Sequence, residues 1–211
     1  MESRELAHVV AAVLMMFVVV SLGFVIAGNT IFLVQAFIFS FVVVVVPVMV
    51  KKGMAYLLDA RVEHEIWMVG RFGWKPKWCF KKPVPFGLFF PIFFSIFTIG
   101  VLKVMTFMTY ETRALKHRAA KRFGSSSFTS MTDWHHGLIG AAGVVSLLLV
   151  SLIAYFPGLE YLSKMAAYYA FWSMIPIGKL DGAQIFFGNR VLWVVLFMLS
   201  IVFALYGLLL P

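Results

Sequence analysis

The sequence predicts an all-α integral membrane protein, a single bundle of about five or six transmembrane helices over residues 1–211. Hydrophobic residues make up 62% of the chain and charged residues 13%, whereas a soluble domain is about one quarter charged. The mean hydropathy of +0.95 agrees with this composition. Several apolar stretches also reach about 20 residues, the length that crosses a bilayer as a helix.

We expect membrane segments at residues 7–27, 31–50, 86–108, 134–156, 159–177 and 191–210. The first is too long for a cleavable signal peptide and lacks a basic start, so we expect it to remain as an anchor. The third is interrupted by Pro91, Gly100 and Lys103 and has basic flanks on both sides. A spanning third segment would put one basic flank outside, so we favour a re-entrant or broken segment.

Basic residues account for the net charge of +9 and gather in two predicted interfacial loops, residues 51–85 and 109–133. This distribution follows the positive-inside rule and argues against nucleic acid as a partner. We expect an amphipathic interfacial helix to continue from the second segment through Ala55–Ile66. The residues predicted to contact anionic lipid headgroups are Lys51, Lys52, Arg71, Lys75, Lys77, Lys81 and Lys82.

The most informative motif follows the fifth segment, where Pro176 precedes Leu180-Asp181-Gly182 and an ionisable side chain lies beside a helix break. An ionisable residue next to a membrane segment is a functional candidate. The alternative interpretation is purely structural: Asp181 and Gln184 have the spacing of a capping box, and Pro176 ends the preceding helix. The residues alone leave both interpretations open.

The wider pattern resembles the small archaeal branch of the site-2 proteases, which are intramembrane zinc metalloproteases. Pro176, Leu180, Asp181 and Gly182 match the family motif, in which the aspartate is a metal ligand, and Ser173 stands where the family has asparagine. Lys52, Ala55 and Glu63 follow the family pattern loosely. The family's HExxH sequence is missing, because its place is taken by Pro47-Val48-Met49-Val50-Lys51.

The missing residues matter because catalytic zinc needs three protein ligands, and the glutamate of HExxH acts as the general base. Asp181 is therefore predicted to be a vacant ligand, with His135 and His136 as the less favoured substitutes. His64-Glu65 begins like HExxH, but Met68 replaces the second histidine, so we interpret His64 and Glu65 as solvated or headgroup-facing. Cys79 is the only cysteine, which excludes an internal disulfide and a cysteine zinc site.

The resemblance implies an inactive site-2-protease-like protein that binds transmembrane segments of other proteins or acts as a subunit of a membrane complex. No cofactor is expected on this hypothesis. The first alternative is an active intramembrane metalloprotease that holds zinc with unusual ligands, and the second is a structural or lipid-interacting membrane protein. The expected location is the plasma membrane of a prokaryote, and the resemblance points to an archaeon.

Overall fold

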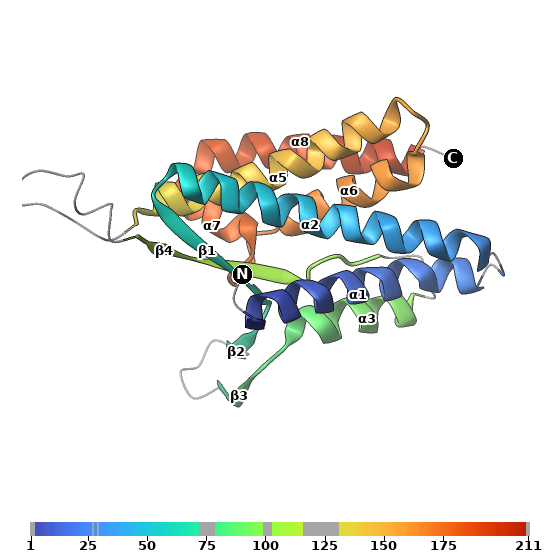
Figure 1. The fold of residues 1–211 in the computed structure, drawn as a ribbon, viewed down its shortest axis with the longest axis horizontal. Helices are drawn as coiled ribbons and strands as arrows, with labels where there is room; N and C mark the ends of the chain where they lie inside the picture. Colours follow the sequence, from blue (N-terminus) through green and yellow to red (C-terminus); the bar gives the residue numbers. More distant parts are fainter. Residues whose placement is uncertain are drawn as a thin grey trace, which may run out of the picture.

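The computed structural model describes residues 3–26, 28, 30–71, 79–98, 103–115 and 131–209. These residues form a mostly helical molecule with four short strands (Figure 1). In chain order the elements are α1 (Ser3–Ile26), the 3₁₀ turn η1 (Thr30–Phe32), α2 (Leu33–Leu57), β1 (Ala60–Ile66), β2 (Val69–Arg71), β3 (Cys79–Val84), α3 (Phe86–Phe97), β4 (Met108–Ala114), α5 (Asp133–Tyr155), α6 (Glu160–Ser173), α7 (Asp181–Gly188) and α8 (Arg190–Leu209).

Within the described residues, four helices are long and apolar enough to cross a membrane: α1, α2, α5 and α8. Helix α6 has 14 residues, so its length is about 21 Å against a hydrocarbon core of about 30 Å. Helix α3 covers only Phe86–Phe97, the first half of the predicted third segment. Residues 103–107 follow without regular structure and lead into β4. Whether this region dips into a membrane stays a prediction.

Strands β1 and β4 pair antiparallel, with Ala60 opposite Ala114 and Ile66 opposite Met108. The amphipathic helix predicted for Ala55–Ile66 is therefore wrong: α2 ends at Leu57, and Asp59 turns the chain with a positive φ of 50°. The polar residues of this stretch alternate with buried ones at the period of a strand. Helical spacing and strand alternation overlap in so short a segment, and pairing with β4 decides between them.

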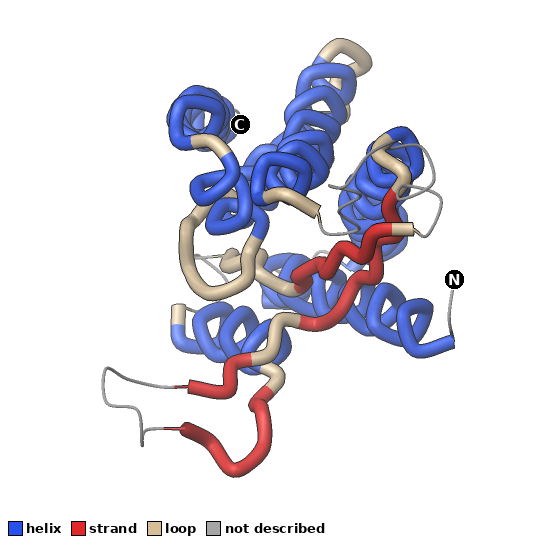
Figure 2. The backbone as a smooth tube through the Cα atoms, turned by 90° about the vertical axis from the view of Figure 1, so that its left-hand side faces the viewer, coloured by secondary structure: helices blue, strands red, loops and turns tan. Residues whose placement is uncertain are grey.

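The β1–β4 pair lies at one end of the molecule, between α1 on one side and α2 and α5 on the other (Figure 1). A second pair, β2–β3, extends away from the helices (Figure 2). Helix α5 is the central element, because it packs against α2, α6 and α7. Eleven of its residues are buried, so this helix forms the middle of the core.

Glycines on α5 let its neighbours approach closely. A Cβ at Gly143 would collide with the aliphatic stem of Lys51, and a Cβ at Gly140 would lie 2.5 Å from the Tyr110 hydroxyl. A Cβ at Gly137 would lie 3.3 Å from Cα of Gly188 in α7. The small-residue face of α5 thus makes room for two long polar side chains as well as for a neighbouring helix.

Candidate functional site

The stretch of residues 47–51 in α2, which the resemblance to the site-2 proteases aligns with HExxH, has one face toward the interior. Pro47, Val48 and Lys51 are buried, whereas Met49 and Val50 are 59% and 37% exposed. Residues i, i+1 and i+4 of a helix lie close to one face, so this pattern follows from the period of 3.6 residues. The three positions that carry histidine, glutamate and histidine in HExxH therefore point into the protein.

The last of these residues, Lys51, forms an ion pair with Asp181 at the start of α7. Its Nζ lies 2.5 Å from Oδ2 of Asp181, and the two side chains are only 8% and 7% exposed. The same ammonium lies 4.7 Å from the centre of the Tyr110 ring, within the range of a cation–π contact. Among the described residues, Oδ1 of Asp181 has no hydrogen-bond partner.

Burial raises the pKa of Asp181 above its ordinary value, and the charge of Lys51 acts in the opposite direction. Burial and the nearby Asp181 raise the pKa of the Tyr110 hydroxyl as well, so Tyr110 is a neutral donor. A buried carboxylate needs a partner. In this structure its partner is an ammonium group on the helix face where the resemblance would place metal ligands.

The geometry of α7 excludes the capping box predicted from Asp181 and Gln184. Leu180 is the N-cap residue, and its side chain makes no capping hydrogen bond. Asp181 follows as the first helical residue, and Nε2 of Gln184 donates instead to the carbonyl oxygens of Tyr110 and Lys179, at 3.0 and 3.2 Å. The capping hydrogen bonds that the structural interpretation predicts are therefore not formed, and the carboxylate of Asp181 pairs with Lys51 instead.

The other motif residues belong to the turn that connects α6 to α7. Ser173 ends α6 and its hydroxyl donates to the carbonyl oxygen of Ala170, 2.8 Å away. Pro176 lies in the turn, and Leu180 is buried. A Cβ at Gly182 would collide with the carbonyl oxygen of Met174, so glycine is needed for this close approach.

A second buried cluster, which we call the Glu5 cluster, consists of Glu5, Lys52 and His64. The carboxylate of Glu5 accepts from Lys52 Nζ at 2.7 Å and from the His64 backbone N–H at 3.2 Å, and it lies 3.1 Å from His64 Nδ1. His64 is 1% exposed, so its interpretation as a solvated or headgroup-facing residue is wrong. Burial, reinforced by the charge of Lys51, lowers the pKa of His64 to about 3, so this histidine is neutral.

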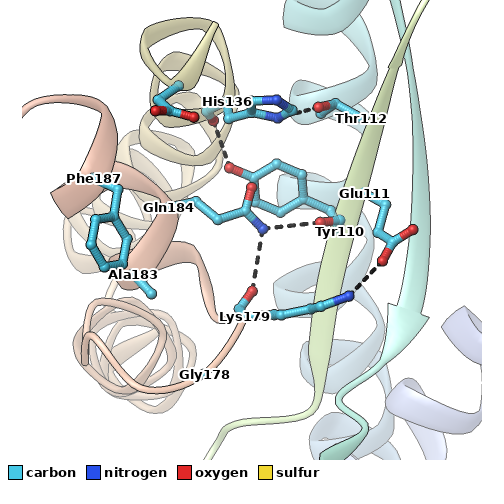
Figure 3. Close-up of a pocket in the computed structure, with 10 residues that line it drawn as sticks. Tyr110, Glu111, Thr112, His136, Gly178, Lys179, Ala183, Gln184 and Phe187 are labelled. Atoms are coloured by element: carbon cyan, nitrogen blue, oxygen red, sulfur yellow. Dashed lines mark hydrogen bonds and ion pairs between the residues drawn. The ribbon is translucent and has the colours of Figure 1, made fainter. Parts of the chain in front are cut away.

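A cavity of about 510 Å³ lies between β4, α5 and α7 (Figure 3). The Tyr110 hydroxyl donates to the backbone carbonyl of His136 at 2.6 Å, and Lys179 Nζ lies 2.8 Å from Glu111. The lining residues that carry polar side chains are Tyr110, Glu111, Thr112, Asp133, His136, Lys179 and Gln184. We refer to this space as the β4 cavity.

The outer edge of β4 borders this cavity. Gln184 reaches the carbonyl of Tyr110 from the α7 side, and alternate residues of a strand direct their backbone groups to the same side. The backbone N–H and C=O of Thr112 therefore point to the same side as the Tyr110 carbonyl, away from β1. In the described part of the chain β4 pairs only with β1, so this edge is open to a further strand.

The donor set does not fit a zinc site. Thr112 hydrogen-bonds Nδ1 of His136, and Thr132 hydrogen-bonds Nδ1 of His135. The described residues contain no group of three or more His, Cys, Asp or Glu side chains that could hold a metal. With the Asp181 carboxylate bonded to an ammonium group, these residues do not make up the three ligands that catalytic zinc takes.

The predicted headgroup contacts divide into three groups. For Lys51 the prediction is wrong because its side chain is buried, and Lys52 is only 26% exposed and paired with Glu5. Lys81 and Lys82 are exposed on β3, where headgroup contact stays a prediction. For Arg71 the backbone belongs to β2, and Lys75 and Lys77 lie outside the described residues.

The fold and site were compared with known proteins. No family model matches the chain, and no curated protein or solved structure matches it either. The likeness to the site-2 proteases accordingly rests on the motif residues of the sequence, and the function must be argued from the geometry of the site.

Proposed function

We propose that the chain is a polytopic membrane protein of the site-2-protease type that has no peptidase activity and binds an extended segment of a partner protein. The ion pair between Lys51 and Asp181 carries this proposal. A fixed ammonium group neutralises the carboxylate that the resemblance assigns to the metal. Val48 occupies the place of the general base, so a bound water would have no group to take its proton.

Binding is the role that the β4 cavity supports. The cavity runs beside an open strand edge, and its volume of about 510 Å³ falls within the range of roughly 300–1,000 Å³ that ligand pockets span. An extended peptide that pairs with β4 would gain backbone hydrogen bonds from the strand and side-chain contacts from α5 and α7. The occupant we propose is a transmembrane or juxtamembrane segment of another membrane protein.

The apolar lengths of α1, α2, α5 and α8 support a location in the membrane. We propose the plasma membrane of a prokaryote, with Lys81 and Lys82 of the β2–β3 pair near anionic headgroups. An archaeal origin rests on the resemblance alone.

The direct test of the metal geometry is to restore the missing ligands. A Pro47→His, Val48→Glu, Lys51→His variant places all three side chains on the inward face of α2. We expect it to bind about one zinc per chain, as a three-ligand site does, and to lose the metal when Asp181→Asn is added. The Lys51→His variant alone serves as the control. A triple variant that folds but binds no zinc would contradict the proposal that this site corresponds to the metal site of the site-2 proteases.

The binding role is tested separately by disulfide trapping. Thr112→Cys, in a Cys79→Ser background, places the only thiol at the edge of β4. The matched control is Phe89→Cys on the exposed face of α3, where the native side chain is 63% exposed. Single-span test proteins with cysteines beside the membrane boundary are expected to crosslink to Thr112→Cys in preference to the control. Equal yields at both positions would contradict a groove at β4.

A further inference from the structure

A second cavity, of about 500 Å³, lies between α6 and α8, away from the β4 cavity. Its walls are largely apolar and aromatic, with Tyr168 and Trp172 from α6 and Leu205 and Gly207 from α8. Two cationic side chains, Lys103 and Lys164, complete the lining. We refer to it as the lysine cavity.

The two lysines reach the cavity from different parts of the chain. Lys164 belongs to the second turn of α6, whereas Lys103 precedes the buried stretch of residues 104–107. Nζ of Lys103 lies 3.2 Å from the hydroxyl of Tyr161 and 5.0 Å from the centre of its ring. Because both lysines line the same largely apolar cavity, their like charges repel one another. A bound anion would relieve this repulsion, because opposite charge is favourable where two like charges share an apolar site.

The position of the cavity suits an amphiphile. Lys164 lies near the start of α6 and Leu208 near the end of α8, and Lys103 lies beside Gly23 near the end of α1. This end of the bundle is opposite the end that carries Asp181 and the start of α8 (Figure 1). In a bilayer crossed by α1 and α8, the lysines therefore lie toward a membrane boundary, where lipid phosphates are found.

The outer face of α8 continues the apolar wall of the cavity. Leu205 and Leu208, which line the cavity, are also 55% and 68% exposed. An acyl chain that lies along these residues would keep its phosphate within reach of the lysines, because both features are at the same end of α8. Surrounding lipid is also the amphiphile present at the highest local concentration.

We infer that the lysine cavity binds an anionic phospholipid, with the phosphate between Lys103 and Lys164 and an acyl chain against α6 and α8. The site rests on the membrane location of the chain but not on the absence of peptidase activity. It differs from contact between a basic loop and a headgroup surface, because two inward-facing lysines and an apolar wall select a single lipid molecule.

The test is native mass spectrometry of the full chain, delipidated in detergent and titrated with dioleoyl phosphatidylglycerol. Dioleoyl phosphatidylcholine has the same acyl chains without the net charge. A Lys103→Met, Lys164→Met variant is expected to bind the anionic lipid about thirtyfold more weakly, since each lysine near a headgroup contributes a factor of about five. Lys103→Arg, Lys164→Arg keeps both charges and is expected to retain most of the binding.

The matched control is Arg61→Met, Arg113→Met, which removes two exposed positive charges at the strand end of the molecule. It is expected to leave binding of phosphatidylglycerol within about twofold of the native value, because neither arginine is among the residues that line the lysine cavity. Equal losses in the control and in the lysine variant would overturn the proposal, as would equal binding of phosphatidylcholine. Saturation by inorganic phosphate or by oleate at lower concentration than by phosphatidylglycerol would likewise assign the cavity to a different anion.

A variant that fails to fold is recognised by its thermal unfolding. Phosphatidylglycerol is expected to raise the Tm of the native chain and of the arginine variant, since a ligand that binds only the folded state stabilises it. If phosphatidylglycerol raises the Tm of the Lys103→Met, Lys164→Met variant by as much as that of the native chain, the proposed site is contradicted even without measured affinities.

Discussion

Lys51 and Lys52 are neighbours in sequence, yet they serve two different buried carboxylates. Lys51 extends between α5 and β4 to Asp181, and both partners are almost fully buried. Lys52 extends to Glu5 on α1 and keeps 26% of its side chain exposed. Adjacent residues on a helix point about 100° apart, so a single pair of lysines anchors α2 to both sides of the molecule.

The difference between the two sites lies in what happens when one partner is removed. At the Asp181 pair, both side chains are almost fully buried, so a group that loses its partner gains little contact with water. At the Glu5 cluster, Lys52 can turn to solvent and His64 is already neutral. We therefore expect the first site to be far more sensitive to single substitutions than the second.

The largest effect is expected from Lys51→Met, which keeps the aliphatic stem beside Gly143 and removes the charge. Asp181 is then buried without a partner, which costs about 3–5 kcal/mol of the free energy of unfolding. Denaturant unfolding in detergent micelles at neutral pH measures this loss. Lowering the pH should recover part of it, because burial raises the pKa of Asp181 and the folded state then takes up a proton.

The double variant Lys51→Met, Asp181→Asn is the control for this pair. It removes both charges, so its loss of stability should be smaller than the sum of the two single losses. Strict additivity would contradict a direct interaction between the two side chains.

A smaller effect is expected from Glu5→Gln. The amide oxygen still accepts one hydrogen bond, and Lys52 can be hydrated, so the loss should be about 1–3 kcal/mol. Denaturant unfolding in detergent measures this loss. The control is Glu65→Gln, at an exposed position on the same strand as His64, and this variant should change the free energy of unfolding by less than about 0.5 kcal/mol. A loss at Glu5 as large as that of Lys51→Met would remove the distinction between the two sites.

The Glu5 cluster also predicts a dependence on pH. The pKa of His64 is about 3 in the folded protein and near 6.5 in an unfolded chain. Between these values the unfolded chain binds a proton that the folded one does not, so stability is lost as the pH falls below about 6.5. His64→Asn keeps a donor toward Glu5 without a titrating ring. When the pH falls from 7.5 to 5.5, the His64→Asn variant should lose about 1.4 kcal/mol less of its free energy of unfolding than the native protein loses.

Equal pH dependence in both proteins would mean that His64 is not a buried neutral residue. The comparison uses the difference between the two unfolding curves, so the carboxylates that titrate in both proteins cancel.

The smallest effect is expected at the exposed pair of Lys179 and Glu111, whose side chains are 69% and 43% exposed. Lys179→Ala should change stability by less than about 1 kcal/mol, and added salt should reduce the difference further. The Lys179 pair is therefore the reference for the two buried sites. A loss above about 2 kcal/mol in high salt would contradict the ranking by burial.

Sequence pattern alone predicted an all-α chain, and this prediction is only partly right because the described residues are mostly helical with four short strands. Four of the helices are long and apolar enough to span a membrane. Helix α5 occupies Asp133–Tyr155 and α8 occupies Arg190–Leu209, close to the predicted ranges 134–156 and 191–210. A long continuous apolar run predicts a helix of membrane length without any knowledge of its packing partners, because its length and hydrophobicity are enough. The sequence also singled out Asp181, since a carboxylate beside a proline break is unusual in apolar sequence, and the structure shows that this side chain is buried.

The partners of the charged residues could not be predicted. Lys51 and Asp181 are 130 residues apart, and Glu5 and His64 are 59 apart, so no local pattern connects them. Basic residues after an apolar segment are typical of headgroup contact. For this reason the sequence predicts lipid contacts for Lys51 and Lys52, whereas both form ion pairs within the protein. Strand β1 was missed for the same reason, because its pairing partner β4 lies more than 40 residues further along the chain.

Elemental analysis of the detergent-purified protein tests most directly whether the Lys51 ammonium group takes the place of a metal beside Asp181. The native chain and an Asp181→Asn variant should both contain zinc only at background level after purification in zinc-containing buffer. About one zinc per chain in the native protein, lost in the variant, would contradict the account and restore the active metalloprotease as the leading hypothesis.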